Sequence, residues 1–274
     1  MKPADSLADS YETLYREFDS PLMRELRREA YGEDIGQHSW VRADELRRDV
    51  VALGLTRSSR LLDLGCGPCG PLTFILVAVG CSGVGLELSA TALAVGRTRA
   101  KSLGVEPLLT VHEADLNEPL GLEPHAFDAA MSLDVVLHLR DRAQFFAEVA
   151  RVLRTGGRFL FTDAGVATGE ISNEEMRRRS IHGHIELVPP GRNEALLEAA
   201  GFRILETEDR TASVVRNAAG RMAAMRAHRG ELERRSGAAD YRRQEDYLEA
   251  VIELAQRRAL SRVMYLSENQ GMHS

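Results

Sequence analysis

Residues 61–71 read Leu-Leu-Asp-Leu-Gly-Cys-Gly-Pro-Cys-Gly-Pro, and the rest of the chain is interpreted outward from them. An apolar segment ending in Asp63 and Leu64 precedes the glycines, and a second apolar run follows them as far as Gly80. Pro71 suits the first position of a helix, and Gly80 suits its C-terminal cap. The pattern predicts a strand, a glycine turn and a helix, in which bare backbone and helix-opening amides can face a ligand.

Gly65, Gly67 and Gly70 fit the pattern G-x-G-x-x-G, which on its own is weak evidence. A dinucleotide site also requires a strand before the turn, a helix after it and an acid about 20 residues later. Glu87 meets the last condition, because it ends a second short apolar segment twenty residues after Gly67. A carboxylate there can accept hydrogen bonds from both hydroxyls of a ribose. These features indicate an adenosine-type ligand.

Asp63 distinguishes between two adenosine-type ligands, NAD and S-adenosylmethionine. It lies two residues before the first glycine, where its charge would repel the pyrophosphate of NAD. S-adenosylmethionine has no phosphate, and it has an ammonium and a sulfonium group that a carboxylate would attract. An NAD-dependent enzyme is therefore the disfavoured alternative.

Residues 62–68, Leu-Asp-Leu-Gly-Cys-Gly-Pro, resemble motif I of the class I S-adenosylmethionine-dependent methyltransferases. The family usually has a third alternating glycine where this chain has Cys69, which would narrow the methionine end of the pocket. The resemblance extends over about residues 36–268 and implies S-adenosyl-L-methionine as the cofactor. It also implies a Rossmann-like α/β fold, with helices on both faces of a seven-stranded sheet in the order 3-2-1-4-5-7-6 and strand 7 antiparallel.

Three parts are expected along the chain. Residues 1–54 carry helical patterns before the first strand and form an N-terminal helical lid. Residues 55–211 and 261–268 form the cofactor-binding methyltransferase core. Residues 212–260 are a helical cap inserted before the last strand, with two helices separated near Gly237.

Local patterns place the elements of this core. The expected strands are 61–64, 83–87, 108–112, 127–133, 158–162, 202–207 and 261–266. A first helix is expected where Leu7, Tyr11, Leu14 and Phe18 recur at helical spacing. The other expected helices are 21–30, 40–53, 71–79, 90–103, 141–153, a short one after Ser172, 194–200, 212–230 and 240–260.

The resemblance, together with the strand ends, suggests residues that contact the cofactor. Asp115 follows the third strand, where the family places an acid that accepts a hydrogen bond from the adenine amino group. Aromatic and polar lid residues often cover the cofactor in related small-molecule enzymes. The candidates are Tyr11, Tyr15, Gln37, Trp40, Asp63, Gly65, Cys66, Gly67, Gly70, Glu87, Leu88, Asp115, Leu116, Ser132 and Leu133.

Three histidines are candidates for a catalytic base, if the acceptor has a proton to lose. His138 follows the fourth strand, at the edge where ligands bind in open α/β sheets. His182 and His184 lie in a loop before Pro189. An imidazole with a pKa near ~6.5 suits proton transfer. The alternative is that His138 packs against the cofactor or lid and that the other two only cap a loop.

Composition narrows the partners and the compartment. With a net charge of −6, the chain lacks the basic balance typical of proteins that bind nucleic acid. Cys66 and Cys69 form C-x-x-C, but without a second cysteine pair or nearby histidine we expect two small turn residues and no metal. An odd cysteine count and no signal peptide indicate a reducing, cytoplasmic setting. The apolar run 71–88 is interrupted by glycines and contains an acid, so no membrane span is expected.

The leading function is methyl transfer to a small molecule at nitrogen, oxygen or carbon, with natural-product intermediates among the candidate acceptors. The resemblance is to the branch with sarcosine, phosphoethanolamine and sterol methyltransferases. Two alternatives remain open: a methyltransferase acting on protein or RNA, and a non-catalytic, cofactor-binding partner subunit. The sequence leaves a homodimer open.

Overall fold

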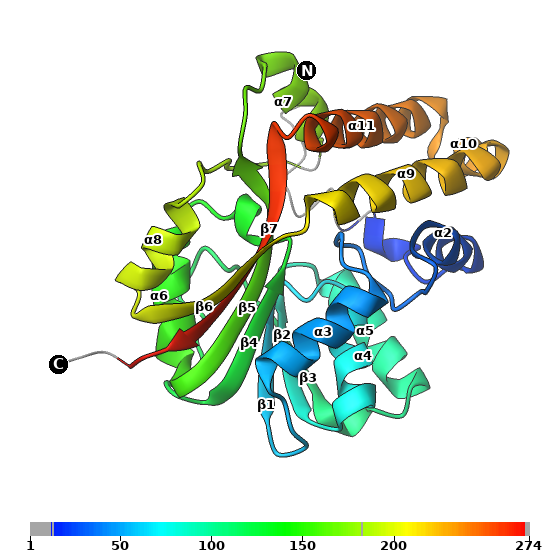
Figure 1. Cartoon of the computed structure of the whole chain (residues 1–274). Helices are drawn as coiled ribbons and strands as arrows, with labels where there is room; N and C mark the ends of the chain where they lie inside the picture. Colours follow the sequence, from blue (N-terminus) through cyan, green and yellow to red (C-terminus); the bar gives the residue numbers. More distant parts are fainter. Residues whose placement is uncertain (1–11, 13, 182, 272–274) are drawn as a thin grey trace.

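The structure is a computed structural model that describes residue 12, residues 14–181 and residues 183–271. One sheet runs through the molecule, with helices on both faces (Figure 1). Its strands are β1 Arg60–Leu64, β2 Ser82–Glu87, β3 Leu109–Glu113, β4 Phe127–Leu133, β5 Leu153–Ala167, β6 Phe202–Asp209 and β7 Leu260–Asn269.

The sheet has seven strands in the order β3-β2-β1-β4-β5-β7-β6, which confirms the predicted order. The strands β1 to β5 pair in parallel, whereas β7 runs antiparallel to both β5 and β6. β5 is longer than predicted, because its pairing with β7 continues to Ala167. The carboxyl ends of β1, β2 and β4 meet at one edge, where this class of sheet binds ligands.

Helices pack on the two faces because side chains alternate along each strand. The helices are α2 Pro21–Tyr31, α3 Ala43–Leu53, α4 Gly70–Val79, α5 Ala90–Ser102, α6 Arg142–Val152, α7 Asn173–Arg179, α8 Arg192–Ala199, α9 Thr211–Ala227, α10 Arg229–Ser236 and α11 Ala238–Gln256, with 3₁₀ turns η1 Glu106–Leu108 and η2 Val136–His138.

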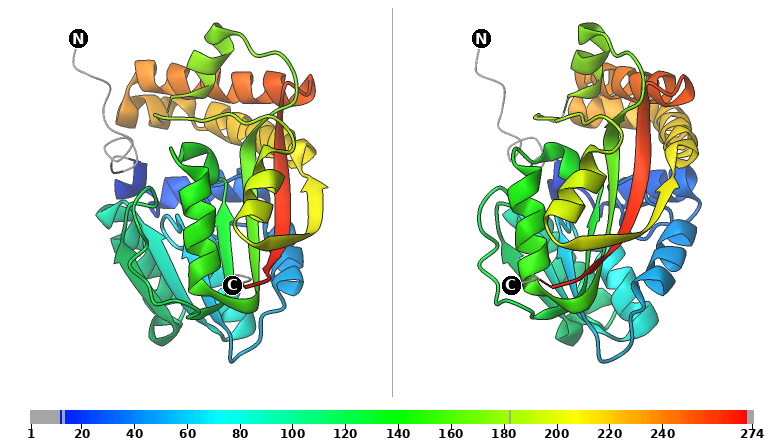
Figure 2. Two further views of the ribbon diagram at one scale, coloured as in Figure 1. Left: turned by 90° about the vertical axis from the view of Figure 1, so that its left-hand side faces the viewer. Right: turned by 60° about the vertical axis from the view of Figure 1, so that its left-hand side comes forward.

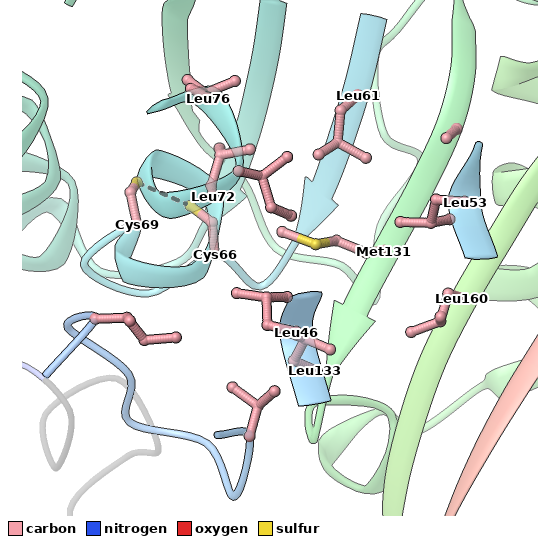
Figure 3. Close-up of a cluster of buried hydrophobic side chains, with 14 of the residues drawn as sticks. Leu46, Leu53, Leu61, Cys66, Cys69, Leu72, Leu76, Met131, Leu133 and Leu160 are labelled. Carbon is pink, nitrogen blue, oxygen red and sulfur yellow. Dashed lines mark hydrogen bonds between the residues drawn. The ribbon is translucent and has the colours of Figure 1, made fainter. Parts of the chain in front are cut away.

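The two largest apolar clusters of the described residues lie on the two faces of the sheet. On one face, Leu61 of β1 packs with leucines of α3 and α4, and the thiols of Cys66 and Cys69 join this cluster (Figure 3). On the other face, Leu62 packs with Phe146 of α6 and with other aromatic residues. Neighbouring residues of one strand thus serve opposite faces.

Several helix ends lie where the sequence predicts them. The Ser20 hydroxyl accepts a hydrogen bond from Met23 N at the start of α2, and Ser89 caps α5 in the same way. α7, the short helix predicted after Ser172, begins with a capping box in which Ser172 and Glu175 bond each other's backbone amides.

Two predicted helices differ in the structure. The helix predicted from Trp40 begins only at Ala43, because the Trp40 amide donates to the side chain of Asp134 at 2.8 Å. The first cap helix ends at Ala227, and α10 begins at Arg229, so three helices replace the predicted two. The predicted break at Gly237 is confirmed.

The cap, defined here as α9, α10 and α11, lies beyond the carboxyl ends of the parallel strands (Figure 2). α2 lies against α9, and a Cβ added to Gly220 of α9 would overlap the Ala30 carbonyl. The lid loop, residues 32–42, connects α2 to α3 beside the pocket described below. Among the described residues, no helix combines the length and apolar character that crossing a membrane requires.

Buried ion pairs hold these parts together. Arg262 of β7 binds Glu45 of α3 at 2.9 Å and Asp134, next to β4, at 2.8 Å. Three other buried arginines also pair with carboxylates: Arg27 with Asp34, Arg142 with Asp163, and Arg210 with Asp49.

Replacing Gly70 tests the contact between the lid loop and α4. In Gly70→Ala the new Cβ would overlap the Gly36 carbonyl, so we expect a loss of about 1–3 kcal/mol in the free energy of unfolding. Gly230→Ala is the matched control, because nothing lies near that position in α10, and there alanine should stabilise by about 0.5–1 kcal/mol. Urea denaturation measures both. Equal effects of the two substitutions would contradict the tight contact.

Candidate active site

A pocket of about 970 Å³, its open mouth included, lies at the carboxyl ends of β1, β2 and β4. The glycine turn after β1, the acid that ends β2, the loop after β3, the turn after β4 and the lid loop surround it. The lining residues are Tyr15, Gly36, His38, Ser39, Asp63, Gly65, Cys66, Gly67, Pro68, Pro71, Glu87, Leu88, Ala114, Asp115, Leu116, Asn117, Leu133, Asp134, Val135, His138 and Leu139.

The glycine turn requires its first two glycines. Gly65 has φ +78°, and a Cβ there would lie 2.6 Å from a Val135 methyl group. Gly67 has φ +52°, and a Cβ there would lie 3.3 Å from the Tyr15 hydroxyl. Both positions favour glycine for conformation and for space. The result is a stretch of bare backbone along the pocket wall.

The two cysteines fill notches behind the turn. A Cβ on Gly85 would lie 2.7 Å from Cys66 Sγ, and a Cβ on Gly96 would lie 2.6 Å from Cys69 Sγ. The two sulfurs are 3.5 Å apart, with Cys69 donating. This hydrogen bond, followed by burial, raises the pKa of Cys66 well above the usual range, so its thiol stays protonated. These contacts support the interpretation of the pair as small turn residues.

Glu87 joins the end of β2 to the glycine turn. One of its oxygens accepts from Gly67 N at 3.0 Å, and the other accepts from Ser89 N at 3.0 Å. Burial raises the pKa of Glu87 despite these bonds. The carboxylate is held in a fixed orientation beside the pocket, with acceptor capacity left for a ligand.

Asp63 is buried at the end of β1 and lines the pocket. Among the described residues, the other three buried carboxylates, on Glu45, Asp49 and Asp163, each bind an arginine. Within the described part of the chain, Asp63 has neither a cation nor a hydrogen-bond donor. Burial, and then the negative charge of Glu87, raise its pKa to about 8. A cationic ligand group would supply the missing partner.

The acid Asp115 and the leucines Leu88 and Leu116 line the pocket at the ends of β2 and β3. Asp115 is exposed, and one of its oxygens accepts from the amide and the side chain of Asn117, each at 2.9 Å. Leu88 is an exposed large apolar residue, whereas Leu116 is buried. Both leucines line the pocket, so they offer apolar surface to a flat ring.

The predicted candidates fall into three groups. Those that line the pocket are Tyr15, Asp63, Gly65, Cys66, Gly67, Glu87, Leu88, Asp115, Leu116, Leu133 and His138. Those placed outside its lining are Gln37, Trp40, Gly70, Ser132 and His184. Tyr11 and His182 lie outside the described residues.

The residues outside the lining have structural contacts instead. Gln37 binds the lid-loop backbone at Ile35 N and Glu33 O. Trp40 packs in an apolar cluster beneath the cap, and the Ser132 hydroxyl donates to Leu64 O at 2.9 Å. Gly70 permits the close approach of the lid loop. We therefore do not include these residues in the proposed cofactor site.

His138 is held through its Nδ1 atom, which lies 2.8 Å from the His184 carbonyl. Because a carbonyl only accepts, Nδ1 carries a proton and, in the neutral ring, Nε2 is the basic nitrogen. Burial, followed among the lowering effects by the Arg179 charge, lowers the pKa of His138 to about 4. His184 contributes its backbone here, and its own side chain is exposed.

Ten lining residues were not among the candidates: Gly36, His38, Ser39, Pro68, Pro71, Ala114, Asn117, Asp134, Val135 and Leu139. Nothing in the local pattern marks the lid-loop residues, because long-range contacts place them. Asp134 has a clearer signal, since it follows β4 directly. It has φ +60°, and its carboxylate accepts from Thr162, Arg262 and the Trp40 amide.

Comparisons with known proteins agree with this geometry. Residues 62–161 match a family model described as a methyltransferase domain. The chain is 31% identical over 201 residues to sarcosine/dimethylglycine N-methyltransferase of Halorhodospira halochloris, covering 71% of this chain and 69% of that protein. It is 31% identical to methyltransferase GfsG of Streptomyces halstedii, covering 57% of each chain.

The structure is also similar to Haemonchus contortus phosphoethanolamine N-methyltransferase 2, solved in complex with phosphomonomethylethanolamine and S-adenosylhomocysteine. The TM-score is 0.81 at 19% identity, over 97% of this chain and 61% of that one, and it supports the fold. The chain thus spans little more than half the length of some relatives. Its glycine turn, its strand order and its relatives place it among the class I S-adenosylmethionine-dependent methyltransferases.

Proposed function

We propose that this protein transfers the methyl group of S-adenosylmethionine to a small-molecule acceptor. The observation that carries the proposal is the buried Asp63 carboxyl, which has no cation among the described residues and faces a pocket built on a glycine turn. Methyltransferase relatives support the reaction, and a pocket beside the lid loop supports an acceptor of small size.

The residues present fit the cofactor group by group. Asp63 would receive the α-ammonium group, and Glu87, fixed by two backbone amides, would accept from the ribose hydroxyls. Leu88 and Leu116 would contact the adenine ring, and Asp115 would accept from its amino group. Gly65 and Gly67 leave the room that a side chain would fill.

The bound cofactor supplies an electrophilic methyl group on a cationic sulfur, so the protein mainly aligns the acceptor and excludes water. Such positioning can contribute roughly 7–11 kcal/mol to lowering a barrier. Tyr15 and His38 approach the pocket from the lid side, with ring centroids 5.9 Å apart. Asp134 holds the lid loop through the Trp40 amide.

His138 is our candidate for a base where the acceptor must lose a proton. Its ring is neutral at pH 7, and the hydrogen bond from Nδ1 to the His184 carbonyl leaves Nε2 as the nitrogen that can accept the proton. His182 and His184 remain alternatives from the same loop. Three buried cysteines without disulfides support a reducing, cytoplasmic setting. The acidic net charge argues against a nucleic-acid partner.

Glu87→Gln tests the ribose contact. The substitution removes a charge-assisted acceptor, so we expect S-adenosylhomocysteine to bind about 5- to 150-fold more weakly, or about 1–3 kcal/mol. Glu113→Gln is the control, because Glu113 ends the neighbouring strand and is exposed outside the pocket lining. Isothermal titration calorimetry measures both. Unchanged affinity in Glu87→Gln would remove Glu87 from the site.

Asp63 should lose a proton when the cofactor product binds. At pH 7 a carboxyl with a pKa of about 8 is mostly protonated, and an adjacent ammonium lowers that pKa. Binding of S-adenosylhomocysteine should then release up to about one proton and strengthen as the pH rises from 6 to 8. Calorimetry in buffers of different ionisation enthalpy measures the release.

Asp63→Asn provides the comparison for that measurement. It keeps the side-chain shape, but it should bind more weakly and release almost no proton. Equal release in the variant and the wild type would show that the proton comes from another group.

Two histidines should titrate far apart. Burial keeps the pKa of His138 near 4, whereas the hydrogen bond from His228 to Glu29 raises the pKa of His228 above its usual value. Nuclear magnetic resonance titration, with each signal assigned by substitution to Gln, measures both. A measured pKa of about 6.5 for His138 would contradict its burial and show that the ring is solvated.

A further inference from the structure

One buried cation has no anion in the described part of the chain. Five arginines are buried, namely Arg27, Arg142, Arg179, Arg210 and Arg262. Four of them bind carboxylates, as described above. Arg179, which is 5% exposed, binds neither a carboxylate nor a carbonyl among the described residues. A buried charge costs several kcal/mol unless it is paired, so this side chain requires an explanation.

Arg179 ends α7, where that helix meets the cap. Its guanidinium carbon lies 5.5 Å from the centre of the Tyr247 ring of α11, an attractive contact that does not neutralise the charge. Arg179 also lines a small cavity between the sheet and the cap. The other residues lining this cavity are Ala164, Thr211, Val214, Val251, Ala255, Leu260, Ser261 and Arg262.

This cavity adjoins the cofactor pocket. Arg262 lines the cavity, and its partner Asp134, 2.8 Å away, lines the pocket. On the other side, the chain that follows α7 returns to the pocket, where the His184 carbonyl binds His138. Arg179 therefore lies between the cap and the part of the fold that carries the pocket.

A second arginine carries positive charge in the same region. Arg221 of α9 lies over the Trp40 ring, 5.0 Å from its centre. Trp40 and Tyr247 belong to one apolar cluster beneath the cap. Among the described residues, no carboxylate forms an ion pair with Arg221. The aromatic cluster thus has a cation on each of these two rings.

We propose that Arg179 binds an anionic group, carboxylate or phosphate, on the methyl acceptor. The proposal rests on the proposed function and specifies its substrate class. A bidentate pair between a guanidinium and either anion is strong where water is excluded. Held there, the acceptor would extend from the cap toward the cofactor pocket, with its anionic end away from Asp63 and its accepting atom toward His138.

The test uses two simple anions as probes. Sodium phosphate and sodium acetate are titrated, at constant ionic strength set with sodium chloride, into the protein with and without saturating S-adenosylhomocysteine. Trp40 is the only tryptophan of the chain and lies in the cluster with Tyr247, so its fluorescence reports binding. Calorimetry gives the S-adenosylhomocysteine affinity of the same samples, so failure of the cofactor site is detected separately.

Arg179→Gln is the test variant, and Arg177→Gln is the control. Arg177 lies on the same helix, is exposed and pairs with Glu174, so its substitution changes the net charge equally. We expect saturable binding of at least one anion to the wild type and to Arg177→Gln. Arg179→Gln should bind it about tenfold more weakly or worse, with unchanged S-adenosylhomocysteine affinity and no loss of thermal stability. Phosphate preferred over acetate would indicate a phosphorylated acceptor, and the reverse a carboxylate.

Arg179→Lys provides a second variant, since it keeps the charge but not the two-pronged geometry. It should retain weaker anion binding. Three results would overturn the proposal: no binding of either anion by the wild type, equal binding by Arg179→Gln, or unfolding of Arg179→Gln, which would reveal a structural partner.

Discussion

Asp63, a carboxyl group buried without a protein cation among the described residues, is the constraint on which the site depends. Its pKa of about 8 means that at pH 7 the Asp63 carboxyl either holds a proton or pairs with a cationic ligand group in the pocket. The cofactor of the family carries the cation that this position lacks. Arg179 is the converse, a buried guanidinium with no described anion. Because the other buried carboxylates and arginines are paired within the protein, these two charges indicate where charged ligands belong.

The parallel strands supply the geometry. Their carboxyl ends bring the glycine turn, Glu87 and Asp134 to one edge, although these residues are far apart in sequence. Asp134 then connects three parts of the fold, because its carboxylate binds Arg262 of β7 and the Trp40 amide of the lid loop. Arg262 in turn binds Glu45 of α3. The same ion-pair network that stabilises the core therefore also positions the lid loop over the pocket.

The features that could be predicted from the sequence are those set by local sequence patterns or implied by the family resemblance. The glycine turn, Glu87 at the end of the second strand and the seven-strand order were all accessible, because each depends on short-range signals or on a strong family resemblance. Trp40 was not: an aromatic residue after a polar loop looks the same whether it faces a ligand or, as here, packs beneath a cap. Arg179 gave no signal either, since its isolation depends on which acids lie elsewhere in the fold.

The most direct test of the central claim is a crystal structure of the protein with S-adenosylhomocysteine. We expect the α-ammonium group within hydrogen-bond distance of Asp63 and the ribose hydroxyls on Glu87, with the thioether sulfur facing the side of the pocket nearest His138. The account would be contradicted by a ligand bound elsewhere, or by one in the pocket whose ammonium group does not contact Asp63.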